Sequence, residues 1–330
     1  MGKLKLFFLM FSGSLLGLLL FGFAYQTTRE DADRVAYPAP GEFYEIDGLN
    51  LHLDCRGQGT PTVVLEAGLT SGSFSWTLVH DAMAEKTRVC AYDRPGMDWS
   101  DPIGRVADAT EVSDRLFNLL EAAEINGSKI LLGMSAGGVY VREYYKNHPD
   151  DIVGMVFVDS SHEQQEDRLP EFEGSGVFEA MMMACRALQP VGIIRMFDLL
   201  DQFVDEYDLD KNTRNALLAN MNQSHTCSSM NWESESFSAE ISDESPPAPL
   251  GDLPLVVLSQ GEEPRAYPEF GLTLEQAIAQ RKVWNVLQQE LTDLSSNSQR
   301  FIAKESGHVI QLNQPELMIE KVTGLALQFR

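Results

Sequence analysis

The pentapeptide Gly133-Met134-Ser135-Ala136-Gly137 constrains the fold of this chain more than any other stretch, because of what flanks it. The apolar run 128–132 before it is typical of a buried strand, and 138–146 after it has the character of a helix. Small residues two positions on either side of the serine let strand and helix approach across a sharp, strained turn. The G-x-S-x-G spacing at such a turn is typical of a nucleophile elbow, which presents the Ser135 hydroxyl above the sheet. The alternative interpretation is a tight strand–helix connection that happens to contain a serine.

Composition bounds the rest of the chain. Its 330 residues are 44% hydrophobic, which is enough for one large α/β domain with an insertion or for two domains, and argues against disorder. The formal net charge of −24 argues against a nucleic-acid partner, whose phosphates need a basic surface, and against electrostatic docking on anionic lipid.

The N-terminal segment 1–28 is predicted to be a membrane anchor or a signal segment, followed by a linker over 29–42. Lys3 and Lys5 precede an apolar stretch from Leu6 to Tyr25 that is long enough to span a bilayer as a helix. With the lysines on the cytoplasmic side, the remainder faces outward. A secretory signal usually has a shorter apolar region, so we favour an uncleaved anchor; if the segment is cleaved, the protein is secreted. Both interpretations place the rest of the chain outside the cytoplasm.

Four cysteines fit that compartment. Cys55 and Cys90 lie in two predicted strands, and Cys185 and Cys227 lie in a predicted insertion. Two bridges within these pairs are one interpretation, and for Cys55 and Cys90 buried free thiols are the other. Because the chain has no C-x-x-C motif and no clustered His/Cys spacing, no metal is predicted.

Apolar runs alternate with helical periodicity along most of the chain, which predicts a mostly parallel sheet covered on both faces by helices. The predicted strands are 43–46, 49–53, 62–66, 87–92, 128–132, 152–158, 253–258 and 300–303, and the main predicted helices are 76–84, 108–125, 138–146, 272–294 and 314–328. The alternation breaks over 160–251, a Met-, Phe- and Leu-rich segment with helical spacing. We therefore predict a core of 43–159 and 252–330 and a helical cap of 160–251.

Four motifs together resemble the α/β-hydrolase superfamily, specifically its serine hydrolases of the esterase/lipase type. They are Glu66-Ala67-Gly68-Leu69, Asp93-Arg94-Pro95-Gly96, Gly133-Met134-Ser135-Ala136-Gly137 and Ser306-Gly307-His308. The resemblance implies an eight-stranded, mostly parallel sheet with a helical cap inserted after the sixth strand. It also implies that the Asp93–Gly96 stretch is a structural turn.

The resemblance also implies a general base and an acid for Ser135. Of the six histidines, His308 alone follows the last predicted strand, where this family places its base; His162 lies near the mouth of the site. The acid usually lies three residues after a glycine that follows the seventh strand, but that position is a proline here. We favour Asp159, at the end of the sixth predicted strand, with Glu263 and Glu262 as alternatives.

An oxyanion hole is expected from two backbone N–H groups, those of Leu69 and Ala136. The leading hypothesis is a membrane-tethered serine hydrolase that cleaves a small-molecule or lipid-like carboxylic ester through an acyl-enzyme on Ser135, without a cofactor. The alternatives are C–C bond hydrolysis or acyl transfer by the same residues, or a non-catalytic binding protein with this fold. Dehalogenase and epoxide-hydrolase chemistry is disfavoured, because those relatives carry Asp at the position of Ser135.

Overall fold

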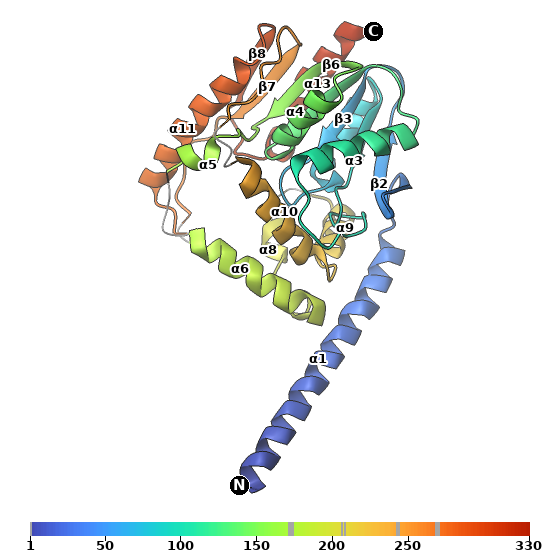
Figure 1. Ribbon diagram of the computed structural model, residues 1–330, viewed down its shortest axis with the longest axis vertical. Coiled ribbons are helices and arrows are strands. Elements are labelled where there is room, and N and C mark those ends of the chain that lie inside the picture. Colours follow the sequence, from blue (N-terminus) through green and yellow to red (C-terminus); the bar gives the residue numbers. More distant parts are fainter. Residues whose placement is uncertain (1, 171–174, 206, 208, 242–244, 268–270) are drawn as a thin grey trace. The chain divides into compact units, whose positions relative to one another are not determined.

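A computed structural model describes residues 2–170, 175–205, 207, 209–241, 245–267 and 271–330 (Figure 1). The chain divides into two compact units. One comprises Pro40–Phe178 and Ser229–Arg330, which we call the core unit. The other comprises Met1–Ala39 and Glu179–Ser228, which we call the anchor unit. The segment predicted as a cap is thus shared between the two units, and the cap domain stays a prediction.

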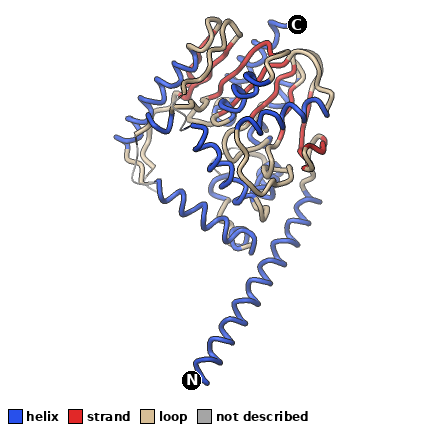
Figure 2. The backbone as a smooth tube through the Cα atoms, in the orientation of Figure 1, coloured by secondary structure: helices blue, strands red, loops and turns tan. Residues whose placement is uncertain are grey.

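The strands of the core unit, red in Figure 2, form one sheet. It has eight strands in the order β1-β2-β4-β3-β5-β6-β7-β8. A hairpin at one edge pairs β1 and β2 antiparallel, β2 is also antiparallel to β4, and every pair from β4 to β8 is parallel. The strands are β1 (Glu42–Ile46), β2 (Leu49–Arg56), β3 (Thr62–Glu66), β4 (Val89–Tyr92), β5 (Lys129–Met134), β6 (Ile152–Val158), β7 (Leu255–Gln260) and β8 (Ser298–Ala303). The predicted mostly parallel, eight-stranded sheet is confirmed.

Helices cover both faces of this sheet, and successive strand residues alternate between two hydrophobic clusters. One cluster joins α3 (Ala109–Ala122), α4 (Gly137–Asn147) and α11 (Leu274–Thr292) to one face; α3 and α4 lie side by side in Figure 1. The other joins α2 (His80–Ala84), α12 (Ile310–Asn313) and α13 (Pro315–Ala326) to the opposite face. Among the described residues, the other helices of this unit are α5 (Gln165–Arg168), α10 (Thr226–Ile241, whose first residues belong to the anchor unit) and the 3-10 turns η1 (Ser73–Trp76) and η4 (Leu327–Phe329).

The prediction of one helix over 76–84 is wrong. The chain forms the 3-10 turn η1 and the short helix α2, separated by three residues. Trp76, Val79 and Met83 are all fully buried, so the apolar spacing that suggested a helix is real. The first of these turns closes with bonds to the residue three positions back, as Thr77 N–H to Phe74 O and Val79 N–H to Trp76 O, which winds tighter than an α-helix.

The anchor unit contains α1 (Gly2–Ala36), η2 (Gln189–Val191), α7 (Ile193–Met196), α8 (Asp201–Val204), α9 (Lys211–Met221) and most of α6 (Ser175–Leu188). Residues Lys5–Ala36 form a helix long and apolar enough to cross a membrane. All four cysteines form disulfides: Cys55–Cys90 joins β2 to β4 in the core unit, and Cys185–Cys227 lies within the anchor unit. The buried-thiol interpretation is therefore wrong.

Candidate active site

Ser135 lies in the turn between β5 and α4, with a backbone φ of 53° that disfavours most side chains. The neighbouring glycines are sterically required. A Cβ on Gly133 would lie 2.4 Å from the carbonyl oxygen of Gly137, and a Cβ on Gly137 would lie 2.4 Å from that of Glu66. A Cβ on Gly138 would meet the Ser160 side chain at the same distance. The five-residue spacing therefore follows from backbone packing around one sharp turn.

His308 lies in the loop after β8, and its side chain contacts Ser135. Its Nε2 lies 2.9 Å from Ser135 Oγ, and its Nδ1 lies 2.6 Å from Asp159 Oδ2. A carboxylate only accepts hydrogen bonds, so Nδ1 carries the ring proton and Nε2 is left to accept the hydroxyl proton. The structure thus brings together three residues that are far apart in sequence, in the geometry of a nucleophile, a base and an orienting acid.

The Asp159 carboxylate is fully buried at the end of β6, where the backbone again has a positive φ, of 42°. Its second oxygen, Oδ1, accepts hydrogen bonds from the Gln260 backbone N–H at 3.0 Å and from Trp284 Nε1 at 2.9 Å. These two donors and His308 provide hydrogen bonds to the Asp159 carboxylate, which offset the free-energy cost of burying it. The Trp284 ring also stands edge-on to His308, with centroids 5.9 Å apart. Sequence reasoning missed Trp284, which lies in a helix without a recognisable motif.

The alternative acids Glu262 and Glu263 lie in the loop after β7, and both are exposed. Among the described residues, only Asp159 offers a carboxylate within hydrogen-bond distance of His308. The two glutamates instead line an open pocket of about 230 Å³, together with Arg281, Trp284 and His308. Their carboxylates are therefore beside the site without contacting its histidine.

The two expected oxyanion donors belong to segments that meet at Ser135. Ala136 follows the serine, and the loop after β3 carries Leu69. A Cβ on Gly68 would lie 3.2 Å from Ser135 Cβ, so this loop passes directly beside the serine. Within the described part of the chain, no backbone carbonyl accepts a hydrogen bond from the N–H of Leu69 or Ala136. Both donors are thus available to a ligand.

Arg94 holds the loop that carries Leu69. Its guanidinium donates to the carbonyls of Ala67 at 2.9 Å, Gly68 at 2.6 Å and Ser71 at 3.1 Å. Burial acts against the charge, but the carboxylates of Glu233 and Glu66, each 2.5 Å from Arg94, raise its pKa well above the usual value. Glu233, on α10, also accepts from the N–H of Thr70. The Asp93–Gly96 stretch, predicted to be only a turn, therefore supplies a residue that shapes the site.

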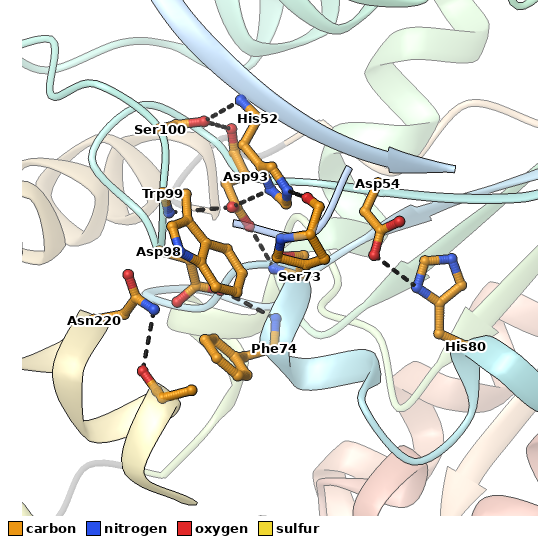
Figure 3. Close-up of polar contacts among 12 residues, drawn as sticks. His52, Asp54, Ser73, Phe74, His80, Asp93, Asp98, Trp99, Ser100 and Asn220 are labelled. Carbon is orange, nitrogen blue, oxygen red and sulfur yellow. Dashed lines mark hydrogen bonds and ion pairs between the residues drawn. The ribbon is translucent and has the colours of Figure 1, made fainter. Parts of the chain in front are cut away.

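A second set of carboxylates holds the far end of the same loop (Figure 3). Asp93 Oδ1 accepts from Ser73 N–H at 2.6 Å, and Asp98 Oδ2 accepts from Phe74 N–H at 3.1 Å. Burial would lower the pKa of His52, but its 2.7 Å contact with Asp93 raises it above the ordinary value. Loss of water and the charge of Asp93 raise the pKa of Asp98 to about 8. The loop beside Ser135 is thus held at one end by Arg94 and at the other by the carboxyl groups of Asp93 and Asp98.

The remaining histidines do not contact Ser135. His80 Nε2 donates to the carbonyl of Val89, and His148 pairs with Asp114. His162 is buried, which lowers its pKa, and its Nε2 lies 3.5 Å from Glu290.

Residues 63–321 match the profile of the alpha/beta hydrolase family. An uncharacterized protein of Schizosaccharomyces pombe is 26% identical over 325 residues, which cover 83% of this chain but only 57% of that protein. A putative lipase of Acinetobacter baumannii has a similar structure, with a TM-score of 0.63, 16% identity and coverage of 92% of this chain and 96% of the lipase. A membrane phospholipase A, described as a novel bacterial virulence factor, has a similar structure with a TM-score of 0.60 at 18% identity, over 98% of each chain.

Proposed function

The chain belongs to the alpha/beta hydrolase family, and we propose that it is a serine hydrolase that cleaves carboxylic esters through an acyl-enzyme on Ser135. The observation that carries the proposal is the continuous hydrogen-bond chain from Ser135 Oγ through His308 to the buried Asp159, at 2.9 and 2.6 Å. Few structural roles require a serine in a strained turn, a half-exposed histidine and a fully buried carboxylate in one line.

The proposed reaction proceeds in two halves. His308 Nε2 takes the Ser135 proton while Oγ attacks the ester carbonyl, and the N–H groups of Leu69 and Ala136 stabilise the resulting oxyanion. His308 then donates this proton to the departing alcohol, which leaves the acyl group on Ser135. A water molecule, deprotonated by the same nitrogen, attacks the acyl-enzyme, and the carboxylic acid leaves with Ser135 reprotonated. Asp159 stays ionised throughout and stabilises the imidazolium.

We further propose that α1 tethers the protein to a membrane with the catalytic residues on the outer side. Lys3 and Lys5 precede the apolar helix, which favours a cytoplasmic N-terminus, and both disulfides suit an oxidising compartment. A tethered hydrolase of this kind suits a small or lipid-like ester substrate.

The test is the Ser135→Ala variant of the full chain in detergent, assayed with a short-chain p-nitrophenyl ester. We expect kcat/KM to fall about 10⁴-fold or more, because the nucleophile is removed. Ser296→Ala, at an exposed position in the core unit, serves as the matched control and should keep full activity. A fluorophosphonate probe should label the parent protein and the control but not Ser135→Ala. Unchanged turnover in Ser135→Ala, or a parent protein that resists the probe, would reject the proposal in favour of a non-catalytic binding protein.

A further inference from the structure

Helix α1 does not end where its apolar stretch ends; it continues as part of the anchor unit. Gly22 is buried against η2, and a Cβ there would lie 2.3 Å from the carbonyl oxygen of Val191. One turn further on, Gln26 is 1% exposed and its amide donates to the carbonyl of Asn222. Helix α1 and the segment after α6 are therefore packed as one body.

We call the contact between α1 and the 189–224 segment the seam. Two charged residues continue the seam along the same face of α1. Glu30, 9% exposed, accepts hydrogen bonds from Gln26 Nε2 at 2.9 Å and from the Ser224 N–H. Asp33 forms an ion pair with Arg195, which follows Val191 by four residues. Buried polar side chains need partners, and Gln26, Glu30 and Asp33 each make at least one polar contact with the 189–224 segment. The position of α1 thus determines the position of the 189–224 segment.

The length of α1 gives the height of this seam in a bilayer. A helix rises about 1.5 Å per residue, so Gly22 lies roughly 24 Å beyond Leu6, the first apolar residue after the lysines. The hydrocarbon core is about 30 Å thick. Gly22 and Gln26 therefore lie at the outer boundary between hydrocarbon and headgroups. Val191, which contacts Gly22, is at the same height.

Exposed apolar side chains follow directly after this contact. Met196, Phe197, Leu199 and Phe203 are 43%, 65%, 44% and 38% exposed, and we call them the 196–203 surface. Ile194 and Val204, at either end of it, are 6% and 2% exposed, so the segment is folded and has its own buried side. A cluster of large exposed apolar side chains in a soluble environment marks an interaction site.

We propose that the 196–203 surface inserts into the outer interface of the membrane that α1 crosses. The partner is a neutral lipid surface, because the chain has a net charge of −24 and the exposed Asp198 lies within the surface. An acidic residue among the apolar ones suits the hydrated headgroup zone, where polar side chains stay solvated. The inference rests on the proposed tether and not on the ester chemistry. It places the anchor unit where lipid-derived esters are concentrated.

The test uses the full chain reconstituted in phosphatidylcholine vesicles, with Phe197→Cys labelled by an NBD fluorophore. The native cysteines are all in disulfides, so the added thiol is the one labelled. Two positions on α1 calibrate the depth: Leu15→Cys, inside the apolar stretch, and Val35→Cys, which is 84% exposed and roughly 20 Å beyond Gly22. Lipids with a nitroxide near the headgroup quench the fluorophore at short range, and aqueous iodide quenches it only where water reaches.

We expect the nitroxide lipids to quench the probe at Phe197 at least twofold more than at Val35, with iodide showing the reverse order. A Leu199→Cys probe should behave like Phe197 and provides the same test if one substitution perturbs the fold. Quenching at both Phe197 and Leu199 equal to that at Val35, with full access for iodide, would overturn the proposal. Ester hydrolysis by the same samples is measured separately, so a protein without esterase activity still gives a decisive fluorescence result.

Discussion

At the residue scale, the proposed site places strained backbone at two adjacent strand ends. Ser135 and Asp159 both have positive φ, and neither is glycine. Each such residue costs about 1–3 kcal/mol and persists only where its surroundings determine it. Here Ser135 O accepts from the N–H groups of Gly138 and Ser161, both at 2.9 Å, and Asp159 N–H donates to Leu258 O at 2.7 Å. This strain directs the serine hydroxyl and the carboxylate to opposite nitrogens of His308.

Exchanging the carboxylate that faces His308 tests which acid operates. Asp159→Asn keeps the shape of the side chain but removes its charge and lets its amide disturb the Nδ1 hydrogen bond. We expect kcat to fall about 10²–10⁴-fold, with KM changing little, because the imidazolium loses its stabilising partner. Glu262→Gln and Glu263→Gln are matched controls and should each stay within about twofold of the parent kcat, by the same reasoning. A large loss in either control with a small one in Asp159→Asn would assign the acid to the loop after β7.

The raised pKa of Asp98 makes a prediction about stability and pH. Its pKa is about 8 in the folded protein against an ordinary 3.8, so the unfolded chain releases this proton near pH 4 while the folded protein keeps it. The contribution of Asp98 to stability is therefore fully present below about pH 4 and is lost as pH rises to about 8. Within this window the loss approaches about 1.4 kcal/mol per pH unit.

Asp98→Asn removes that dependence, since the amide does not titrate and its oxygen still accepts from Phe74 N–H. The free energy of unfolding is measured by chemical denaturation at pH 5, 6 and 7. Tryptophan fluorescence reports on the core unit, because all four tryptophans lie in it. We expect the variant to gain stability relative to the parent as pH rises. If the free energies of unfolding of the two proteins changed in parallel with pH, the pKa of Asp98 would not be raised and the prediction would be wrong.

At the scale of single elements, the β5–α4 turn and helix α13 place opposite demands on glycine. Gly137 begins α4 with the carbonyl oxygens of Glu66 and Ala67 at 2.4 and 2.6 Å from where a Cβ would be. Gly324 lies in α13 with open space around that position and is exposed. The same substitution therefore has opposite consequences in the two elements.

Gly137→Ala should destabilise the core unit by about 1–3 kcal/mol, because two backbone carbonyls must move. Gly324→Ala should stabilise it by about 0.5–1 kcal/mol, because alanine is the better helix former. Both predictions are checked by comparing the denaturation midpoint of each variant with that of the parent protein. A neutral Gly137→Ala would mean that the turn is looser than the described packing.

At the scale of the whole molecule, the apolar N-terminal helix belongs to a folded unit. Gly17 and Gly22 are two glycines of the same helix, one turn and a half apart. A Cβ on Gly17 would meet nothing within 4 Å, whereas one on Gly22 would meet Val191 O. Substitutions at these two glycines therefore test separately whether α1 acts only as a membrane segment or also packs against η2.

We expect Gly22→Ala to loosen the seam between α1 and η2 and Gly17→Ala to leave it intact. Trypsin cleavage at Arg29 and Arg34, which requires local opening of a helix, should accelerate roughly fivefold or more in Gly22→Ala alone. Cleavage sites are read by mass spectrometry of the detergent-solubilised protein. Equal cleavage rates in both variants would contradict the packed seam.

The sequence by itself determined the features that depend on local sterics and periodicity. The glycines around Ser135 are required by a turn a few residues long, and the alternation of strands and helices indicated the sheet, because burial on both faces leaves continuous apolar runs. The helix over 76–84 failed for the complementary reason: apolar spacing is nearly the same for a 3-10 turn and an α-helix over so few residues.

Only the tertiary structure decided which groups meet across long separations. Asp159 was favoured among three carboxylates, but its contacts with His308 and Trp284 span 149 and 125 residues. Glu233 reaches Arg94 across 139 residues, and Arg195 reaches Asp33 across 162. No local pattern encodes such pairs, because the residue type at one position does not specify which distant residue it will contact. Their partners are selected by how the packed elements cross, which is a property of the folded chain.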